Sequence, residues 1–162
     1  MKHLFLFAFL TLSFAACDKE TATPNKASQL RGKWKISASK RTSFYFYTQR
    51  DTTVNWFPSL PACYKDDILT LRDGFNGEVF YGAVACTPAE QNIDDITWQV
   101  IQKDTVLEVN NAKRMFFGAD PMRGTLVGDI SNSFTIRYQN TETDTLTNRL
   151  TTATYENTYT RQ

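Results

Sequence analysis

Apolar and polar residues alternate with a period of two along most of this chain, and that alternation restricts its fold more than any other feature. Trp34, Ile36 and Ala38 fall on one face of the segment 32–39, and lysine and serine side chains fall on the other. The pattern returns in four later segments, which are residues 96–100, 107–109, 134–138 and 153–159. A period of two is typical of a strand with one buried face. No segment after residue 28 keeps the helical period over three turns, so we expect no long helix.

Turn-forming dipeptides separate the predicted strands at short intervals. They are Asp73-Gly74, Asn76-Gly77, Lys103-Asp104, Asn110-Asn111 and Asp120-Pro121. Such spacing fits successive hairpins better than the long crossovers that parallel strands need. The sequence therefore predicts an all-β domain of eight to ten short antiparallel strands, closed as a barrel or stacked as a sandwich. We expect the last two strands to form one long hairpin with a polar tip at residues 141–147.

The first 16 residues have the order of a secretory signal: a short positive start, an apolar run and small residues at the end. The apolar run is shorter than the ~20 residues that a membrane-spanning helix needs. Its end, Phe14-Ala15-Ala16-Cys17, resembles a bacterial lipobox. The resemblance implies cleavage before Cys17, a diacylglycerol on the Cys17 thiol and an acyl chain such as palmitate on the new amino group. We therefore expect residues 1–16 to be a lipoprotein signal peptide.

Residues 17–29 are predicted to be the lipidated Cys17 and a flexible tether, because they contain a proline and no periodic apolar pattern. Directly after Cys17, Asp18-Lys19-Glu20 resembles a signal for surface display in some lipoproteins of the Bacteroidota. The same residues also fit a plain solvated linker, and both interpretations remain open. The expected location is the outer membrane, at its periplasmic face or on the cell surface. The folded domain is then expected at residues 30–162.

Two further motifs carry a resemblance to a known family. Gly32-Lys33-Trp34 at the start of the first strand resembles the lipocalin signature, in which the Trp packs across the base of an eight-stranded up-and-down barrel. The segment from Cys63 to Leu71, followed by Cys86 and Trp98, is similar to lipocalin-like lipoproteins of the Bacteroidota. The chain lacks the second lipocalin motif, Thr-Asp-Tyr. The arginine that covers the Trp in lipocalins is not assigned by the sequence, and the candidates are Arg123, Arg137, Arg149 and Arg161.

If Cys17 carries lipid, two of the three cysteines are left to pair with each other. Cys63 and Cys86 then remain as a pair in an oxidising compartment, where a disulfide is expected. A metal site is the rival interpretation. It is disfavoured because neither residue belongs to a Cys-x-x-Cys motif, and because the one histidine, His3, lies in the predicted signal.

The residue inventory argues against catalysis. Without histidine after residue 3, the domain has no imidazole base, no Ser-His-Asp triad and no histidine-ligated metal, so we expect no enzyme activity and no cofactor. A net charge of +1 argues against nucleic-acid binding. Two acidic pairs, Asp66-Asp67 and Asp94-Asp95, offer either a calcium or carboxylate-catalysis site, or solvated turns and structural hydrogen bonds. Neighbours on a strand face opposite ways, which favours the second interpretation.

Binding is the function class that remains. Aromatic residues at inward strand positions predict a pocket for a small apolar ligand, and the candidates are Trp34, Tyr81, Trp98, Tyr138 and Tyr155. The same side chains also suit a solid core. The run Phe44-Tyr45-Phe46-Tyr47, with Trp56-Phe57, predicts a lid or a partner-binding patch, or a strand buried on both faces. A ligand-binding lipoprotein is thus the first hypothesis. The alternative is a structural or protein-interaction module of a surface assembly with a filled barrel.

Overall fold

The structure is a computed structural model that describes residues 25–45, 49–87, 93–144 and 148–162. The predicted signal at residues 1–16, the proposed lipid attachment at Cys17 and the Asp18-Lys19-Glu20 segment lie outside the described residues. Phe46 and Tyr47 of the aromatic run lie outside them as well. Within the described part of the chain, no helix has the length and apolar character to cross a membrane.

Nine strands and four short helical segments make up the fold of the described residues. The strands are β1 (Gly32–Tyr45), β2 (Arg50–Asn55), β3 (Ile68–Leu71), β4 (Asn76–Phe80), β5 (Ile93–Ile101), β6 (Val106–Asn110), β7 (Met122–Val127), β8 (Ser133–Asp144) and β9 (Arg149–Arg161). The helices are α1 (Lys26–Leu30) and α2 (Ala62–Lys65), and the 3₁₀ turns are η1 (Phe57–Ser59) and η2 (Asp73–Phe75). The prediction of an all-β fold with eight to ten strands is confirmed.

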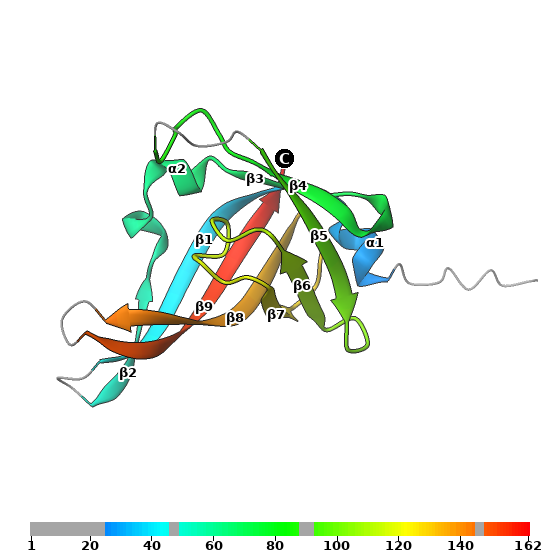
Figure 1. Ribbon diagram of the computed structural model, residues 1–162. Coiled ribbons are helices and arrows are strands. Elements are labelled where there is room, and N and C mark those ends of the chain that lie inside the picture. Colours follow the sequence, from blue (N-terminus) through cyan, green and yellow to red (C-terminus); the bar gives the residue numbers. More distant parts are fainter. Residues whose placement is uncertain (1–24, 46–48, 88–92, 145–147) are drawn as a thin grey trace, which may run out of the picture.

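The strands form one antiparallel barrel with an up-and-down order (Figure 1). From β3 onward each strand pairs with the next, and β1 pairs with both β3 and β9, which closes the ring. The ring therefore contains eight strands, as in a lipocalin-like barrel. The ninth strand, β2, pairs with the second half of β1 and forms an edge. All six residues of β2 are exposed.

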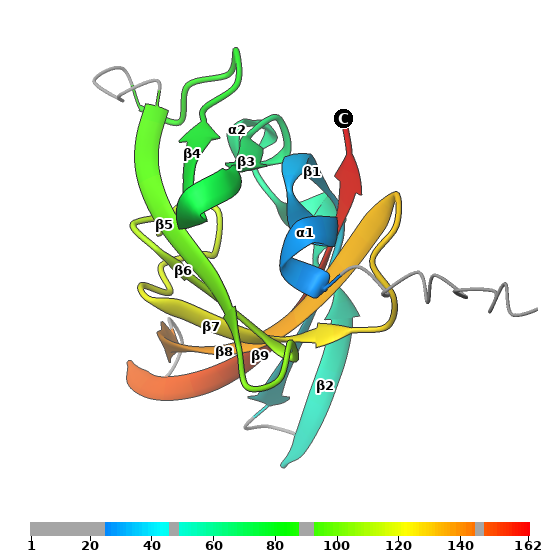
Figure 2. The same ribbon diagram turned by 90° about the vertical axis from the view of Figure 1, so that its right-hand side faces the viewer.

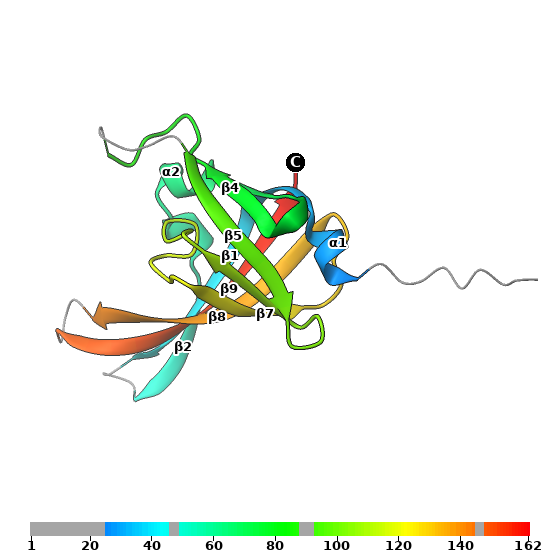
Figure 3. The same ribbon diagram turned by 45° about the vertical axis from the view of Figure 1, so that its right-hand side comes forward.

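One end of the barrel opens into a longer sheet. β1 pairs with β3 only as far as Lys35, and β8 pairs with β7 only as far as Tyr138. Beyond those points β2, residues 40–45 of β1, residues 139–144 of β8 and residues 149–156 of β9 continue as a four-stranded extension (Figures 1 and 3). We call this extension the flared sheet. It includes the outer part of the C-terminal hairpin that the sequence predicts. Residues 145–147 of the predicted polar tip lie outside the described residues.

A β-bulge in β1 reverses part of the predicted inward pattern. Ile36 pairs with Tyr159 while Ala38 pairs with Thr158, so Ser37 is an extra residue in β1. As a result Ala38 faces solvent, and the prediction that it shares the buried face of Trp34 is wrong. Ser39 points inward instead and is fully buried. Its hydroxyl donates a hydrogen bond of 2.7 Å to Asn157 Oδ1, which satisfies the buried polar group.

Helix α1 lies across the other end of the barrel (Figure 2). The Asn25 side chain caps it by accepting a hydrogen bond of 2.8 Å from the Ser28 amide. At its far end, Leu30 is fully buried in the core. Residues 26–29, which the sequence analysis assigns to the tether, therefore belong to a helix that packs on the barrel.

Arg161 fixes α1 to the first and last strands. Its guanidinium lies 4.2 Å from the centre of the Trp34 ring. It also donates hydrogen bonds of 2.7 Å to the Arg31 carbonyl and 2.8 Å to the Gln29 carbonyl. The Trp34 indole N–H donates to the Leu30 carbonyl at 2.6 Å. Together these donors satisfy carbonyls that the end of a helix leaves without partners.

The structure explains why a glycine stands two residues before Trp34 in the Gly-x-Trp motif. Gly32 has a φ of +133°, and a Cβ there would lie 2.4 Å from Arg161 Nη1. Only glycine leaves room for the guanidinium above Trp34. Of the four arginines that the sequence left as candidates, Arg161 is therefore the one that covers the Trp.

We predict that Arg161→Ala lowers the free energy of unfolding by about 2 to 4 kcal/mol, since it removes two charge-assisted hydrogen bonds and the contact with Trp34. Arg149→Ala is the matched control, because Arg149 is exposed at the start of β9, and we expect a change within about 0.5 kcal/mol. Urea denaturation followed by tryptophan fluorescence measures both values. Equal stability of the two variants would contradict the role assigned to Arg161.

Candidate functional site

All five predicted pocket residues lie inside the barrel. At most 9% of the surface of any of them is exposed, and they are Trp34, Tyr81, Trp98, Tyr138 and Tyr155. The structure brings Tyr138 and Tyr155 together as a stacked pair with ring centres 5.5 Å apart. Trp34 packs edge-on against Phe134 at 4.9 Å. The other two residues make separate contacts, so the five do not line one common space.

The Trp98 indole is held by backbone groups of the β3–β4 turn. Its N–H lies 3.2 Å from the Arg72 carbonyl and 3.0 Å from the Asn76 carbonyl. The ring of Phe75 in the same turn packs edge-on against it at 5.9 Å. These contacts place Trp98 in the wall of the core and account for its N–H group without any ligand.

A loop between β6 and β7 fills the open end of the barrel. We call residues 111–121 the plug loop. Phe116 in this loop is fully buried, and its ring packs edge-on against Tyr138 at 5.8 Å and Tyr159 at 6.1 Å. Met115 is 3% exposed and belongs to the same core cluster. The phenyl ring thus occupies space next to Tyr138, where the sequence predicted a ligand.

On one side, the plug loop contacts residues of the C-terminal hairpin. The Asn140 side chain donates a hydrogen bond of 2.7 Å to the Phe117 carbonyl. The Phe117 ring packs against Tyr155 at 5.1 Å and against Tyr64 at 6.0 Å. The alternation and turn patterns of the sequence did not predict this loop. The available signal was Met115-Phe116-Phe117, three apolar residues in a row between two turn dipeptides.

A buried ion pair fixes the other side of the plug loop. Nε of Arg114 lies 2.9 Å from Oδ2 of Asp67, and the two side chains are 9% and 0% exposed. A terminal nitrogen of Arg114 also donates to the Cys63 carbonyl at 2.5 Å. Removing either charge would leave the other buried without its partner, which typically costs about 3–5 kcal/mol. The ion pair therefore resists withdrawal of the loop from the barrel.

Two tyrosines flank the Arg114 guanidinium. The ring of Tyr81 lies 4.3 Å from it and the ring of Tyr64 lies 5.5 Å from it. The Tyr81 hydroxyl donates a hydrogen bond to Asp94. Burial and this hydrogen bond raise the pKa of Tyr81 well above its ordinary value. Tyr81 thus supports the plug loop rather than an empty pocket.

The acidic pairs of the sequence serve as structural partners. Asp66 accepts a hydrogen bond of 2.9 Å from the Val84 amide, while Asp67 binds Arg114. Asp94 accepts from Tyr81, and Asp95 faces solvent. The two carboxylates of each pair therefore lie in different environments. Across the described residues, no three histidine, cysteine, aspartate or glutamate side chains gather as a metal site would need.

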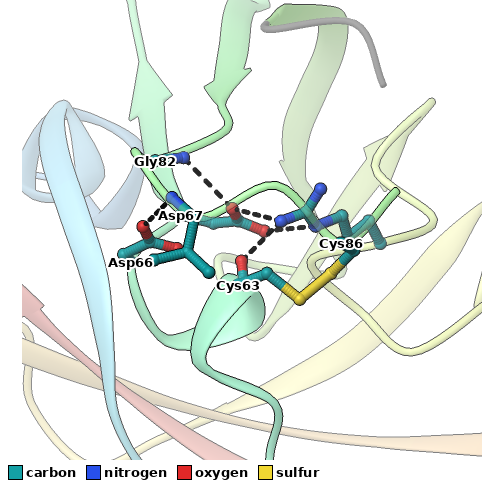
Figure 4. Close-up of a disulfide and its surroundings, with 7 residues drawn as sticks. Cys63, Asp66, Asp67, Gly82 and Cys86 are labelled. Carbon is teal, nitrogen blue, oxygen red and sulfur yellow. Dashed lines mark hydrogen bonds and ion pairs between the residues drawn. A yellow bond between two sulfur atoms is a disulfide. The ribbon is translucent and has the colours of Figure 1, made fainter. Parts of the chain in front are cut away.

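The predicted disulfide between Cys63 and Cys86 is present, with their Cα atoms 5.4 Å apart (Figure 4). It joins α2 to the segment after β4, close to Asp67. The Gly82 amide in that segment lies 3.4 Å from Asp67 Oδ1. The sequence separation is 23, for which the chain-entropy account gives about 3.5 kcal/mol of stabilisation. The disulfide and the ion pair thus secure the same end of the barrel.

A polar network continues from the core into the flared sheet. Asn157 donates hydrogen bonds to the hydroxyls of Tyr138 and Tyr159 at 3.1 and 3.4 Å. Farther out, the Tyr155 hydroxyl donates to Glu142 Oε2 at 2.9 Å, and Arg41 forms an ion pair with the same carboxylate. Burial, together with the hydrogen bond to Glu142, raises the pKa of Tyr155 to about 12.

The aromatic segment of the sequence divides into exposed and packed residues. Phe44 and Tyr45, at the outer end of β1, are 46% and 47% exposed. Trp56 and Phe57 are partly buried against the core. Arg41 lies 5.3 Å from the Trp56 ring, and Lys65 lies 5.3 Å from the Phe57 ring. Of the predicted patch, the described residues that expose an aromatic ring most are therefore Phe44 and Tyr45.

We predict that the protein loses stability as the pH rises from about 10 to about 12, because four buried tyrosines keep their protons in the folded state: Tyr81, Tyr138, Tyr155 and Tyr159. An unfolded tyrosine loses its proton near pH ~10. Above that pH the folded state binds more protons than the unfolded state, so the free energy of unfolding falls with rising pH.

The fall is at most about 1.4 kcal/mol per pH unit for each of these tyrosines. Urea denaturation across this pH range measures it, and tyrosinate absorbance reports the ionisation. Tyr155→Phe should reduce the slope, because one of the four protons is then absent. A free energy of unfolding that stays constant up to about pH 12 would contradict the prediction.

Comparison of the chain with protein-family models, with curated proteins and with solved structures found no match.

Proposed function

We propose that this protein is a lipid-anchored, non-catalytic lipocalin-like module of the outer membrane, and that it acts through contacts with other proteins. The observation that carries the proposal is the plug loop. Its residues Met115 and Phe116 fill the barrel beside Tyr138, in the place where a carrier protein would hold its ligand. The filled interior favours the interaction module over the small-ligand carrier that the sequence suggests first.

A carrier function would require the plug loop to leave the barrel. Withdrawal would break the ion pair of Arg114 with Asp67 and expose Phe116 to water. It would also separate Phe117 from the Asn140 amide. These costs act together because all three contacts belong to one short segment. A molecule that entered the barrel would have to offset all of them.

The flared sheet is the surface that suits a protein partner. Phe44 and Tyr45 expose nearly half of their surface there, and Leu150 at the start of β9 is 76% exposed. Exposed apolar side chains gathered at one end of a molecule are typical of interaction sites. The flared sheet lies at the end opposite α1, where the described chain begins (Figure 1). In an anchored protein this sheet would therefore be the part of the domain farthest from the tether.

The anchor and the lack of catalysis are proposed from the sequence. Two or more acyl chains on Cys17 hold a protein on a membrane stably, at ~0.8 kcal/mol per buried methylene group. The lipobox resemblance at residues 14–17 supports such an attachment. The absence of histidine after residue 3 supports a binding role rather than an enzyme.

We predict that Cys17→Ala abolishes metabolic labelling with palmitate and releases the protein from the membrane fraction, because the acceptor thiol is gone. Ser28→Ala is the control, since Ser28 lies after the predicted lipobox, and it should keep both label and location. Labelling followed by fractionation measures the outcome. Persistent label in Cys17→Ala would refute the anchor.

We predict that the wild-type barrel binds no apolar probe and that Phe116→Ala gains binding of benzene or indole. Truncation of the ring leaves a dry cavity next to Tyr138 and Tyr159, and it lowers the free energy of unfolding by about 3–5 kcal/mol. Phe80→Ala is the control because Phe80 is 44% exposed. It should bind no probe and lose little stability.

Isothermal calorimetry and thermal melts measure both effects of the Phe116 variant. Tight binding of a fatty-acid probe by the wild type would contradict the filled barrel and favour the carrier function. Crosslinking from position 44 then tests the partner surface separately, because Phe44 lies outside the barrel core.

A further inference from the structure

The outer face of the barrel carries a groove that no part of the proposed function uses. It has a volume of about 460 Å³ and lies over β7 and β8, beside the β5–β6 turn. Its polar lining comes from six side chains, which are Gln102, Arg123, Thr125, Arg137, Gln139 and Thr154. The strand residues among them occupy the positions that alternate with the buried ones, so these side chains lie on the outer face of the barrel.

The strand register places two arginines next to each other along this groove. Thr125 of β7 pairs with Arg137 of β8, and Arg123 lies two residues before Thr125 on the same face. Diagonal neighbours of this kind have Cα atoms roughly 7–8 Å apart. Their ion pairs lie on opposite sides, because Arg123 binds Glu108 on β6 and Arg137 binds Glu156 on β9. The two guanidinium groups therefore line opposite sides of the groove.

Each arginine is held in place by a glutamate on a neighbouring strand. Nε of Arg123 binds Glu108, whose carboxylate also accepts a hydrogen bond of 2.7 Å from Gln99. Nε and Nη2 of Arg137 bind Glu156 at 3.1 and 2.7 Å. In the part of the chain that the structure describes, these contacts leave both terminal nitrogens of Arg123 and Nη1 of Arg137 available to a ligand. The guanidinium groups are thus positioned by the protein but not saturated by it.

The rest of the groove suits a molecule with several hydroxyl groups. The amides of Gln102 and Gln139 and the hydroxyls of Thr125 and Thr154 donate and accept hydrogen bonds without carrying charge. The volume falls at the lower end of the range of small-molecule sites, about 300–1,000 Å³. A monosaccharide or disaccharide has this size and this pattern of groups.

We propose that the outer groove binds an anionic sugar, with its carboxylate or sulfate on Nη1 of Arg137 and its hydroxyls on Arg123 and on the glutamine and threonine side chains. A nucleic-acid strand is a poorer fit. Its binding depends on many lysines and arginines that neutralise successive phosphates, whereas the lining of this groove holds two arginines. The anionic sugar is recognised by two charges and a short row of neutral polar groups.

The test is a calorimetric and NMR titration of the full chain in detergent micelles. The probes are glucuronate and glucose 6-sulfate as the carboxylate and sulfate forms, with glucose and acetate as controls. We expect one or both anionic sugars to shift the amide resonances of β7 and β8 and to bind more tightly than either control. Raised salt should weaken the binding because the contacts are charged.

Substitutions at Thr125 separate recognition from folding, because the residue is exposed on the floor of the groove. Thr125→Glu places a carboxylate beside Arg137 and should weaken binding about tenfold or more. Thr125→Gln has a similar size without the charge and should retain most of the affinity. Lys33→Gln changes an exposed cation on β1 and should have no effect. Thermal melts show whether each variant is folded.

The possible results decide between the assignment and its rivals. Failure of both anionic sugars to bind would overturn the proposal. Acetate that binds as tightly as glucuronate would overturn the assignment of a sugar, and glucose that binds as tightly would overturn the role of the arginines. Equal affinity of folded Thr125→Glu and the wild type would remove the groove as the binding site.

Discussion

The pairing of the first strand with the last is the interaction on which the rest of the structure depends. β1 and β9 are joined along residues 34–43, and this seam turns a row of hairpins into a closed ring. Closure gives the inward side chains of all eight strands a common core. It also brings Arg161 over Trp34 and so fixes α1 at the base. Without the seam, both edges of the row would be open, as β2 still is at the flared sheet.

Local sequence pattern was enough to predict the fold class. Alternation identified the inward residues of β8 and β9, and turn dipeptides separated the hairpins. The pattern failed at Ala38, because the bulge at Ser37 changes the phase of β1 and its position depends on the partner strand. The sequence did not distinguish among four arginines as the one that covers Trp34. The choice of Arg161 depends on the register of strands that are distant in the sequence. Local signals therefore predict strands, and pairing decides which residues meet.

The interior was harder to predict than the wall. The five proposed pocket residues are indeed buried, but the ring that packs against Tyr138 comes from the plug loop, which has neither strand nor helix periodicity. Arg114 and Asp67 are 47 residues apart in the sequence, and nothing local marks them as an ion pair. The outer groove could not be predicted either, because its residues come together only through strand pairing. Arg123 and Arg137 each look like ordinary solvated strand residues until the register places them side by side.

The plug loop also changes how binding inside this barrel should be judged. Phe116 behaves as a ligand that is covalently attached to its own site, and a short tether gives such a group an effective concentration of order millimolar. A free apolar molecule present at micromolar concentration would have to bind about 10³-fold more tightly than the phenyl ring to replace it. Any ligand of the barrel interior must therefore compete with Phe116, which is part of the same chain and already occupies the site.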